Sequence, residues 1–518
     1  MIQLPRRRLL TTLGVGLFAG HGAALAQPTF ADTPFQLGVA AGDPMPDGFV
    51  IWTRLAPRPL EPGYGMAAAP MAVTWDVASD RDFTTIVRHG EAIARPELAH
   101  AVHVEVEGLQ AGRPYFYRFR CGGHASAVGR ARTAPAVGSA VDGARFVVLG
   151  CQSFEQGFYT GHVRAAEEDA DFVYCYGDYI YEGAAAPTYT GSGGTMQNPR
   201  VHLGGECYSL DDYRRRYAQY KMDHDLQVSH AAAAWFCTFD DHDVHSNWVG
   251  DVDEDGAPPE VFRLRRQAAF QAYYEHMPLR RSAFPTGSAM QMYRNAQWGD
   301  LLDLNFLDTR QHRSLQPCEN ARAATCAAVD AAEAQVLGEA QEAWLYRNLD
   351  ASRAQWKVLA QQVMMMDLDR KDGPEVGYSL DTWAGYRIPR QRLLRRLRER
   401  RIDNVVVLTG DEHQNYAGEL HIDGREPEDA PVAAEFVVTS ISSSGDGQDQ
   451  RADGRRYLAD NAFLKFNNAQ RGYAVCDVTP ETWRTAFKVL DKVSEPGGTL
   501  STRATYAVER GSSRVVAA

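Results

Sequence analysis

Four uninterrupted apolar segments are the features that most constrain how this sequence can fold. Polar residues of types that bind metals follow directly after each segment. The first segment, residues 146–150, shows no apolar–polar alternation, which is typical of a strand buried on both faces. Comparable segments occupy residues 172–176, 234–239, 405–408 and, more weakly, 436–438. Helical patterns lie between them, the clearest at residues 211–220, 341–349 and 390–400. The sequence therefore predicts an α/β (α+β) core, which we assign to residues 144–495.

A different pattern precedes this core. Apolar and polar residues alternate over short stretches separated by Pro, Gly and Asp, at residues 49–54, 71–77, 102–106 and 115–119. Regular short strands of this kind predict a small β-sandwich, which we assign to residues 34–133. Residues 496–518 are expected to be a C-terminal tail. A chain of 518 residues is long enough for this two-domain arrangement.

The first 26 residues have the features of a leader. Arg6, Arg7 and Arg8 precede an apolar stretch that ends in the small-x-small sequence Ala24-Leu25-Ala26. This pattern predicts a bacterial signal peptide for residues 1–26. Its arginines fit the twin-arginine export pathway, with an ordinary secretory signal as the alternative. No other stretch has the ~18 to 20 apolar residues that a membrane span requires. The sequence thus predicts a periplasmic or secreted bacterial protein.

Charge and cysteine content narrow the function classes. The formal net charge of −12 argues against a nucleic-acid-binding protein, which needs clustered Lys and Arg. Anionic small substrates are still allowed, because a bound metal can reverse the local field. Among the eight cysteines, Cys318 and Cys326 lie close together in a polar loop and could pair. Most of the others lie in apolar, strand-like runs, where a buried inert thiol is the ordinary interpretation.

The residues after each apolar segment carry the chemistry. In order along the chain they are Cys151; Asp178 and Tyr181; Asp240, Asp241, His242 and Asn247; and Asp411 and His413. Ligands of α/β sheets bind at the carboxyl ends of strands, so these side chains are expected to meet at one edge. Thiolate, phenolate and imidazole suit a transition metal, whereas carboxylate and amide oxygens suit Ca²⁺ or Mg²⁺. The mixture predicts at least two metal ions of different character.

Each of these elements has an ordinary structural explanation when taken alone. A Gly-Asp pair after a strand is common in turns, and a lone Cys such as Cys151 is more often buried and inert. Residues 240–243 could form a solvated acidic loop. Four strand ends with ligand-type residues in one domain are hard to obtain by chance, so the ordered set favours a metal site.

The ordered motifs resemble the alkaline phosphatase D (PhoD-like) family of metallophosphoesterases. They are Cys151-Gln152, residues 177–182, residues 240–244 with Asn247, and residues 410–413. Weaker similarities at residues 38–54, 307–310, 356–358, 381–386 and 471–473 extend the resemblance over almost the whole mature chain. The resemblance implies a four-layer αββα metallophosphatase core behind an N-terminal β-sandwich. It also implies one Fe³⁺ and one or two Ca²⁺ ions.

The resemblance assigns ligand roles to individual residues. Cys151 and Tyr181 would bind iron as thiolate and phenolate, and Asp178 would bridge iron and calcium. Asn247 and Asp240 would serve the calcium side. Asp411 and His413 would close the site from the fourth strand.

Four positions are expected to act around these ligands. His242 and Asn247 are the candidates for catalysis. His242 could orient water or protonate the leaving group, or it could instead hold a carboxylate in place. Asp241 and Asn415 are candidates for ligand support or substrate contact, and Asn415 stands where some relatives carry an arginine that can touch phosphate.

The implied function is an exported metal-dependent alkaline phosphatase. It would hydrolyse phosphate monoesters, and diesters as a second class, drawn from small-molecule or lipid phosphoesters. A phosphodiesterase or phospholipase D of the same family is one alternative. A degenerate metal-binding surface protein is the other.

Overall fold

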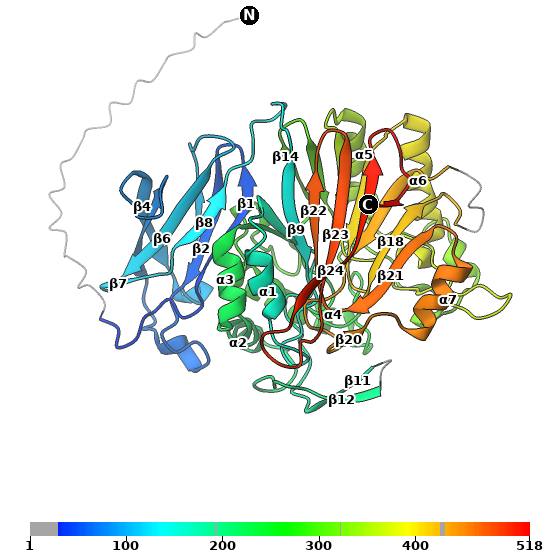
Figure 1. Cartoon of the computed structure of the whole chain (residues 1–518). Helices are drawn as coiled ribbons and strands as arrows, with labels where there is room; N and C mark the ends of the chain where they lie inside the picture. Colours follow the sequence, from blue (N-terminus) through cyan, green and yellow to red (C-terminus); the bar gives the residue numbers. More distant parts are fainter. Residues whose placement is uncertain (1–28, 192–193, 322, 425–429) are drawn as a thin grey trace, which may run out of the picture.

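The computed structural model describes residues 29–191, 194–321, 323–424 and 430–518. The predicted leader, residues 1–26, lies outside these ranges. Two large β-sheets lie face to face, and helices cover the outer face of each (Figure 1). None of the helices in the described ranges has the length and apolarity to cross a membrane.

The first sheet has ten strands and contains three of the four predicted apolar segments. In spatial order the strands are β25 (Val516–Ala517), β24 (Leu500–Glu509), β23 (Thr482–Leu490), β22 (Gly472–Val478), β9 (Ala144–Leu149), β10 (Phe172–Cys175), β13 (Ala234–Cys237), β1 (Val39–Met45), β2 (Gly48–Arg54) and β5 (Ala101–Val106). Its outer face is covered by α1 (Thr160–Ala166), α2 (Leu210–Lys221), α3 (His224–Ala232) and α4 (Pro259–His276).

The second sheet has eight strands and contains the remaining segment. In spatial order the strands are β14 (Arg294–Trp298), β15 (Leu302–Phe306), β16 (Trp356–Ala360), β17 (Val405–Thr409), β19 (Ala433–Val437), β18 (Asn415–Leu420), β21 (Leu464–Gln470) and β20 (Gly447–Gln448). Its helices are α5 (Gly338–Ala351), α6 (Arg387–Arg400) and α7 (Ala452–Asp460). A separate hairpin, β11 (Thr188–Gly191) and β12 (Gly194–Gln197), extends from the edge of the molecule (Figure 1).

The apolar segments are buried on both faces because both faces are covered. Phe146 of β9 packs between the sheets in the same cluster as Leu304 of β15 and Val358 of β16. The next residue, Val147, points the other way and packs with Tyr217 of α2 and other helix residues. This alternation produces the four-layer αββα order, so the predicted fold class is confirmed.

The N-terminal strands share a sheet with the core. The five-stranded sheet of β3 (Met71–Ala78), β4 (Ile86–Ala94), β6 (Pro114–Cys121), β7 (His124–Ala125) and β8 (Gly129–Arg132) is separate. It packs on β1, β2 and β5 through residues such as Phe49 and Tyr117, as a sandwich does. However, β1 also pairs in parallel with β13, with Ala41 opposite Ala234. The change near residue 133, from short alternating stretches to continuous apolar segments, therefore does not mark a boundary between sheets.

The expected C-terminal tail also belongs to the ten-stranded sheet. Within residues 496–518, β24 pairs with β23 along its length and β25 pairs with β24. Val508 and Val515 pack in the core between the two sheets. Short alternating stretches at a sheet edge give a weak sequence signal, which is why these strands were not predicted.

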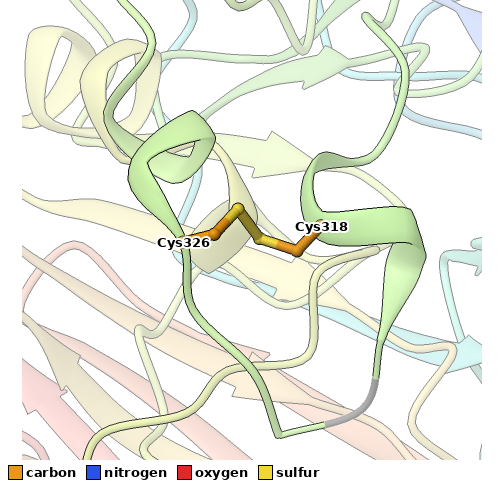
Figure 2. The surroundings of a disulfide bond; sticks show 2 residues. All are labelled: Cys318 and Cys326. Atoms are coloured by element: carbon orange, nitrogen blue, oxygen red, sulfur yellow. A yellow bond between two sulfur atoms is a disulfide. The ribbon is translucent and has the colours of Figure 1, made fainter.

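Cys318 and Cys326 form a disulfide bond in the loop between β15 and α5 (Figure 2). The other six cysteines are free and buried. Just before the disulfide, the side chain of Gln316 donates to the backbone oxygen of Asn247 and to Asp381 Oδ1, at 2.7 Å each. The cross-linked loop therefore contacts the loop that carries the predicted ligand Asn247.

A buried lysine lies at the junction between the N-terminal strands and the core. Lys221, at the end of α2, is 1% exposed. Its ammonium group lies 4.3 Å from the ring centre of Trp52 in β2 and 5.1 Å from that of Tyr179. The rings favour the charged form. Burial outweighs them and lowers the pKa of Lys221 to about 7.

Replacing Lys221 with Met is expected to stabilise the protein more at pH 7 than at pH 10. Between these values the unfolded chain binds a proton at this lysine that the folded chain does not, so wild-type stability rises with pH. The slope is at most about 1.4 kcal/mol per pH unit. Melting temperatures measured from pH 6 to 10 test this, with Lys492→Met, at a partly exposed lysine, as control. A constant difference between Lys221→Met and wild type would contradict it.

Candidate metal centre

Four strand ends converge where the two sheets meet. Cys151 follows β9, Asp178 follows β10, Asp240 and Asp241 follow β13, and Asp411 and His413 follow β17. Their ligand atoms form overlapping groups, each within 4.8 Å: Cys151, Asp178 and His413; Asp178, Asp241 and His242; and Asp178, Asp240, Asp241 and Asp411. The structure thus brings together seven of the residues predicted from the strand ends, and Asp178 belongs to all three groups.

One side of the site combines a thiol, a phenol and an imidazole. The Cys151 thiol donates to Asp178 Oδ2 at 3.3 Å, and the Tyr181 hydroxyl donates to the same oxygen at 2.9 Å. The Tyr181 hydroxyl also lies 3.1 Å from His413 Nε2. Burial and the nearby carboxylates raise the pKa of Cys151 and of Tyr181 well above their ordinary values. Burial, with Arg471 and His242, lowers the pKa of His413 to about 3, so its imidazole is neutral and able to bind a metal.

The other side combines four carboxyl groups. Burial and mutual repulsion with Asp240 and Asp241 raise the pKa of Asp178 and of Asp411 well above the ordinary range. Asp240 Oδ2 and Asp241 Oδ1 are buried and accept no hydrogen bond from any described residue. Unpaired buried carboxylate oxygens are unfavourable unless a cation lies nearby. The donor set therefore fits bound metal ions.

Arg310 supplies the nearest fixed positive charge. Its side chain is fully buried; Nε donates to Asp240 Oδ1 at 2.6 Å and Nη1 donates to Asp381 Oδ2 at 2.7 Å. Nη2 lies 3.4 Å from Asp241 Oδ1. These carboxylates hold the pKa of Arg310 well above its usual range despite its burial. One guanidinium cannot neutralise all the carboxyl groups of the site, so the need for further cations remains.

His242 is fixed from two sides. Its Nδ1 lies 2.8 Å from Glu182 Oε2, and its ring stacks on the ring of Tyr181 with centres 4.2 Å apart. Its Nε2 lies 3.9 Å from Asp241 Oδ2. Burial opposes a charge on the ring, but Asp241, Glu182 and Asp178 outweigh it and raise the pKa of His242 well above its ordinary value. Because Glu182 accepts the Nδ1 proton, Nε2 is the atom that faces the site.

Two predicted site residues, Asn247 and Asn415, make different contacts from the eight others. The Asn247 backbone N–H donates to Asp241 Oδ2 at 2.7 Å, but its side-chain amide donates to Glu254 at 2.9 Å. Asn415 is fully buried; its amide donates to Asn468 Oδ1 at 3.1 Å and accepts from Thr439 N at 3.0 Å. The Asn415 side chain is thus engaged within the second sheet.

The backbone is strained where the ligand-type residues lie. Cys151, Asp178, Asn247, Asp411 and His413 all have φ between 47° and 65°. This left-handed region is uncommon for residues other than glycine and costs on the order of 1–3 kcal/mol at each position. Such strain persists at functional sites because the surrounding structure holds it in place.

Glycines let the strand ends approach one another closely. Gly177, before Asp178, has φ of +137°, and a Cβ there would lie 2.5 Å from the backbone N of Asp240. A Cβ on Gly410, before Asp411, would lie 2.1 Å from the ring of Tyr176. These contacts agree with the expected role of glycine before the aspartates.

The loop after β19 contributes residues that sequence reasoning missed. Ser443 Oγ lies 2.7 Å from the Tyr181 hydroxyl, and Ser444 Oγ lies 2.9 Å from His413 Nδ1. Arg471 holds this loop by donating to Ser440 Oγ and to the Ser443 carbonyl oxygen. The sequence feature that could have indicated these serines is their position after the apolar segment at residues 436–438.

Comparisons with known proteins point to one family. Residues 146–487 match the model of the PhoD-like phosphatase family, and residues 22–135 match the model of its N-terminal domain. Over 501 residues the chain is 43% identical to a protein named alkaline phosphatase D from Bacillus subtilis (strain 168), covering 96% of this chain and 85% of that protein.

A solved structure described as "Structure of PhoD" matches with a TM-score of 0.92. The two are 43% identical, and the match covers 95% of this chain and 93% of that one. With both family models matched and a relative aligned over nearly the full length, the chain belongs to the PhoD-like phosphatase family of hydrolases.

Proposed function

We propose that this protein is an exported, metal-dependent alkaline phosphatase that hydrolyses phosphate monoesters. Family membership gives the reaction class, hydrolysis of a phosphoester. The observation that supports metal dependence is the convergence of thiol, phenol, imidazole and four carboxyl groups within one buried site. Neither a nucleophilic serine nor a nucleophilic cysteine is required, and Cys151 acts as a ligand.

The donor chemistry divides the site between two kinds of cation. Cys151 and Tyr181 have raised pKa values and need a strong Lewis acid to ionise, for which Fe³⁺ is suited, with neutral His413 beside them. The oxygen-rich side, with Asp240 and Asp411, suits Ca²⁺. Asp178 would serve both kinds of cation, since its carboxylate belongs to the group with Cys151 and His413 and to the group with Asp240 and Asp411. Asn247 would complete the oxygen set if its amide turned away from Glu254, to which it donates here.

Residues of the chain itself position and transfer the proton that the leaving oxygen receives. When bound, the cations supply positive charge that polarises the phosphoester and lowers the pKa of water. Glu182 holds the Nδ1 proton of His242, and stacking on Tyr181 fixes the ring, so Nε2 carries the transferable proton. His242 then protonates the leaving oxygen. Asp241 orders the loop by accepting the Asn247 N–H.

Replacing Cys151 with Ser is expected to remove visible absorption from the purified protein before it disturbs the fold. A tyrosinate–Fe³⁺ pair absorbs visible light, and serine is a poorer iron ligand than a thiolate. Absorption spectra and iron analysis of the same sample measure the effect. Cys175→Ser is the matched control, since Cys175 is also a buried thiol but lies on the helix-facing side of β10. Equal colour in both variants would contradict the iron assignment.

The function itself is tested by comparing p-nitrophenyl phosphate with bis-p-nitrophenyl phosphate at alkaline pH. Both assays are run with and without added Ca²⁺, with metal analysis of the same preparation. Faster monoester hydrolysis with bound iron supports the proposal. Faster diester hydrolysis identifies a phosphodiesterase or phospholipase D of the same family. Hydrolysis of neither substrate despite a full metal content favours the metal-binding surface protein.

Export is supported by the predicted leader and by the disulfide. Disulfides persist in oxidising compartments outside the cytoplasm, and Cys318–Cys326 is such a bond. We place export on the twin-arginine pathway. Replacing Arg6, Arg7 and Arg8 with Lys keeps the positive charge of the leader, so it is expected to retain the protein in the cytoplasm while leaving ordinary secretion possible. Cell fractionation measures this, and unchanged periplasmic protein would indicate a secretory signal instead.

A further inference from the structure

A second group of metal-ligand side chains lies beside the strand-end site. Glu206 precedes α2, His245 follows β13 and Asp255 precedes α4, and one ligand atom of each lies within 4.8 Å of the others. We name these three residues the outer cluster. Glu182 links it to the strand-end site, because Oε2 contacts His242 and Oε1 contacts His245.

The hydrogen bonds of His245 leave one ring nitrogen without a partner. Nδ1 lies 3.2 Å from Glu182 Oε1 and 3.8 Å from Glu206 Oε1. A carboxylate can only accept, so Nδ1 carries the hydrogen. His245 is 5% exposed, yet Nε2 makes no hydrogen bond to any described residue. The Nε2 lone pair is therefore buried and available.

The distance from Nε2 to the nearest carboxylate suits a shared cation. Nε2 lies 3.3 Å from Asp255 Oδ2, but the contact lacks hydrogen-bond geometry. This contact is favourable only when a positive charge, either a proton on Nε2 or a metal ion, lies between the nitrogen and the carboxylate oxygen. Two ligands bound at about 2.0 Å with a tetrahedral angle stand about 3.3 Å apart, so a small divalent ion fits this pair.

The charges around the ring favour a cation. Glu182, Glu206 and Asp255 surround His245, and Arg265 offsets part of their charge by donating to Glu206 Oε1 at 2.7 Å. Glu206 still offers a carboxylate oxygen within 4.8 Å of ligand atoms of His245 and Asp255. Asp255 has a side chain that is 72% exposed, which gives an ion a path from solvent.

We propose that Glu206, His245 and Asp255 bind a divalent transition-metal ion, Zn²⁺ by their ligand chemistry. One imidazole and two carboxylates, with water completing the shell, form a set that zinc accepts. Glu182 acts as the carboxylate that holds the Nδ1 hydrogen of a metal-binding histidine. This site is separate from the proposed catalytic metals and stands or falls independently of the proposed function.

The test is zinc uptake by the full-length holoprotein and its variants. Each protein is incubated with Zn²⁺ at pH 8, where protons compete weakly for imidazole, then desalted and analysed for zinc, iron and calcium. Asp255→Asn removes a ligand at an exposed position, so folding should be unaffected. Glu260→Gln, at an exposed acid on α4, is the matched control. Wild type and Glu260→Gln should retain one more zinc per chain than Asp255→Asn, with iron and calcium equal in all three.

Equilibrium dialysis adds a second measurement. The zinc affinity of Asp255→Asn and of Glu206→Gln should be about tenfold or more weaker than that of wild type. Equal zinc content and affinity in wild type and both variants would overturn the proposal. Zinc uptake matched by equal loss of iron or calcium in every protein would also overturn it, because the zinc would then occupy the strand-end site.

Discussion

Asp178→Asn is expected to lower kcat/KM for phosphoester hydrolysis by about a thousandfold or more, which corresponds to several kcal/mol of lost transition-state stabilisation. Asp178 belongs to three of the four ligand groups found among the described residues, and its Oδ2 accepts from both Cys151 and Tyr181. An amide of the same shape is neutral and cannot bridge two cations. Steady-state kinetics with metal analysis of the same sample measure the effect.

A matched control separates this loss from a general effect on folding. Asp303→Asn changes a buried aspartate of β15 whose pKa is also raised by burial but which lies outside every ligand group. It should keep both metal content and activity. If Asp178→Asn retained its metals and its rate, the bridging role of Asp178 would be wrong.

Arg310→Met is expected to destabilise the fold by about 3–5 kcal/mol, because it leaves buried carboxylates without their counter-charge. The guanidinium contacts Asp240, Asp241 and Asp381, and no part of its side chain is exposed. Bound cations compensate part of the same charge. The decrease in melting temperature of Arg310→Met relative to wild type should therefore be larger after treatment with a chelator than in the metal-loaded protein.

The Arg310 experiment needs two comparisons, one with a surface arginine variant and one between the chelated and the metal-loaded protein. Arg263→Met breaks a surface ion pair with Asp251, so its effect should stay within about 1 kcal/mol with or without metals. An equal destabilisation of Arg310→Met in both metal states would show that the arginine and the cations do not share the same carboxylates.

The sequence predicted the central strands well because burial on both faces leaves an unbroken apolar run. Residues 146–150 and 405–408 illustrate this, and each ends at the site as the strand-end rule requires. The edge strands β24 and β25 were missed, since a half-covered edge needs only a short and irregular apolar pattern. The sharing of one sheet by β1 and β13 was missed because it depends on pairing between distant segments.

The site residues that escaped prediction act through tertiary contacts. Arg310 enters the sequence analysis only within the weaker family similarity at residues 307–310, and nothing along the chain indicates that it contacts Asp240 from the opposite sheet. Ser443 and Ser444 carry no ligand-type group of their own, and they matter because they reach Tyr181 and His413. Asn415 stands where some relatives carry an arginine, but the direction of β18 turns its side chain toward Asn468.

The pairing of β1 with β13, and of β9 with β22, determines when during synthesis this protein can fold. β1 lies near the N-terminus and leaves the ribosome early with its antiparallel partner β2, but its parallel partner β13 emerges only much later. β9 must wait for residues 472–478, close to the end of the chain. Until then both strands have unpaired edges that can attach to other chains. Folding is thus postponed until translation is almost complete, and an N-terminal fragment produced alone would expose the edge of β1 and aggregate.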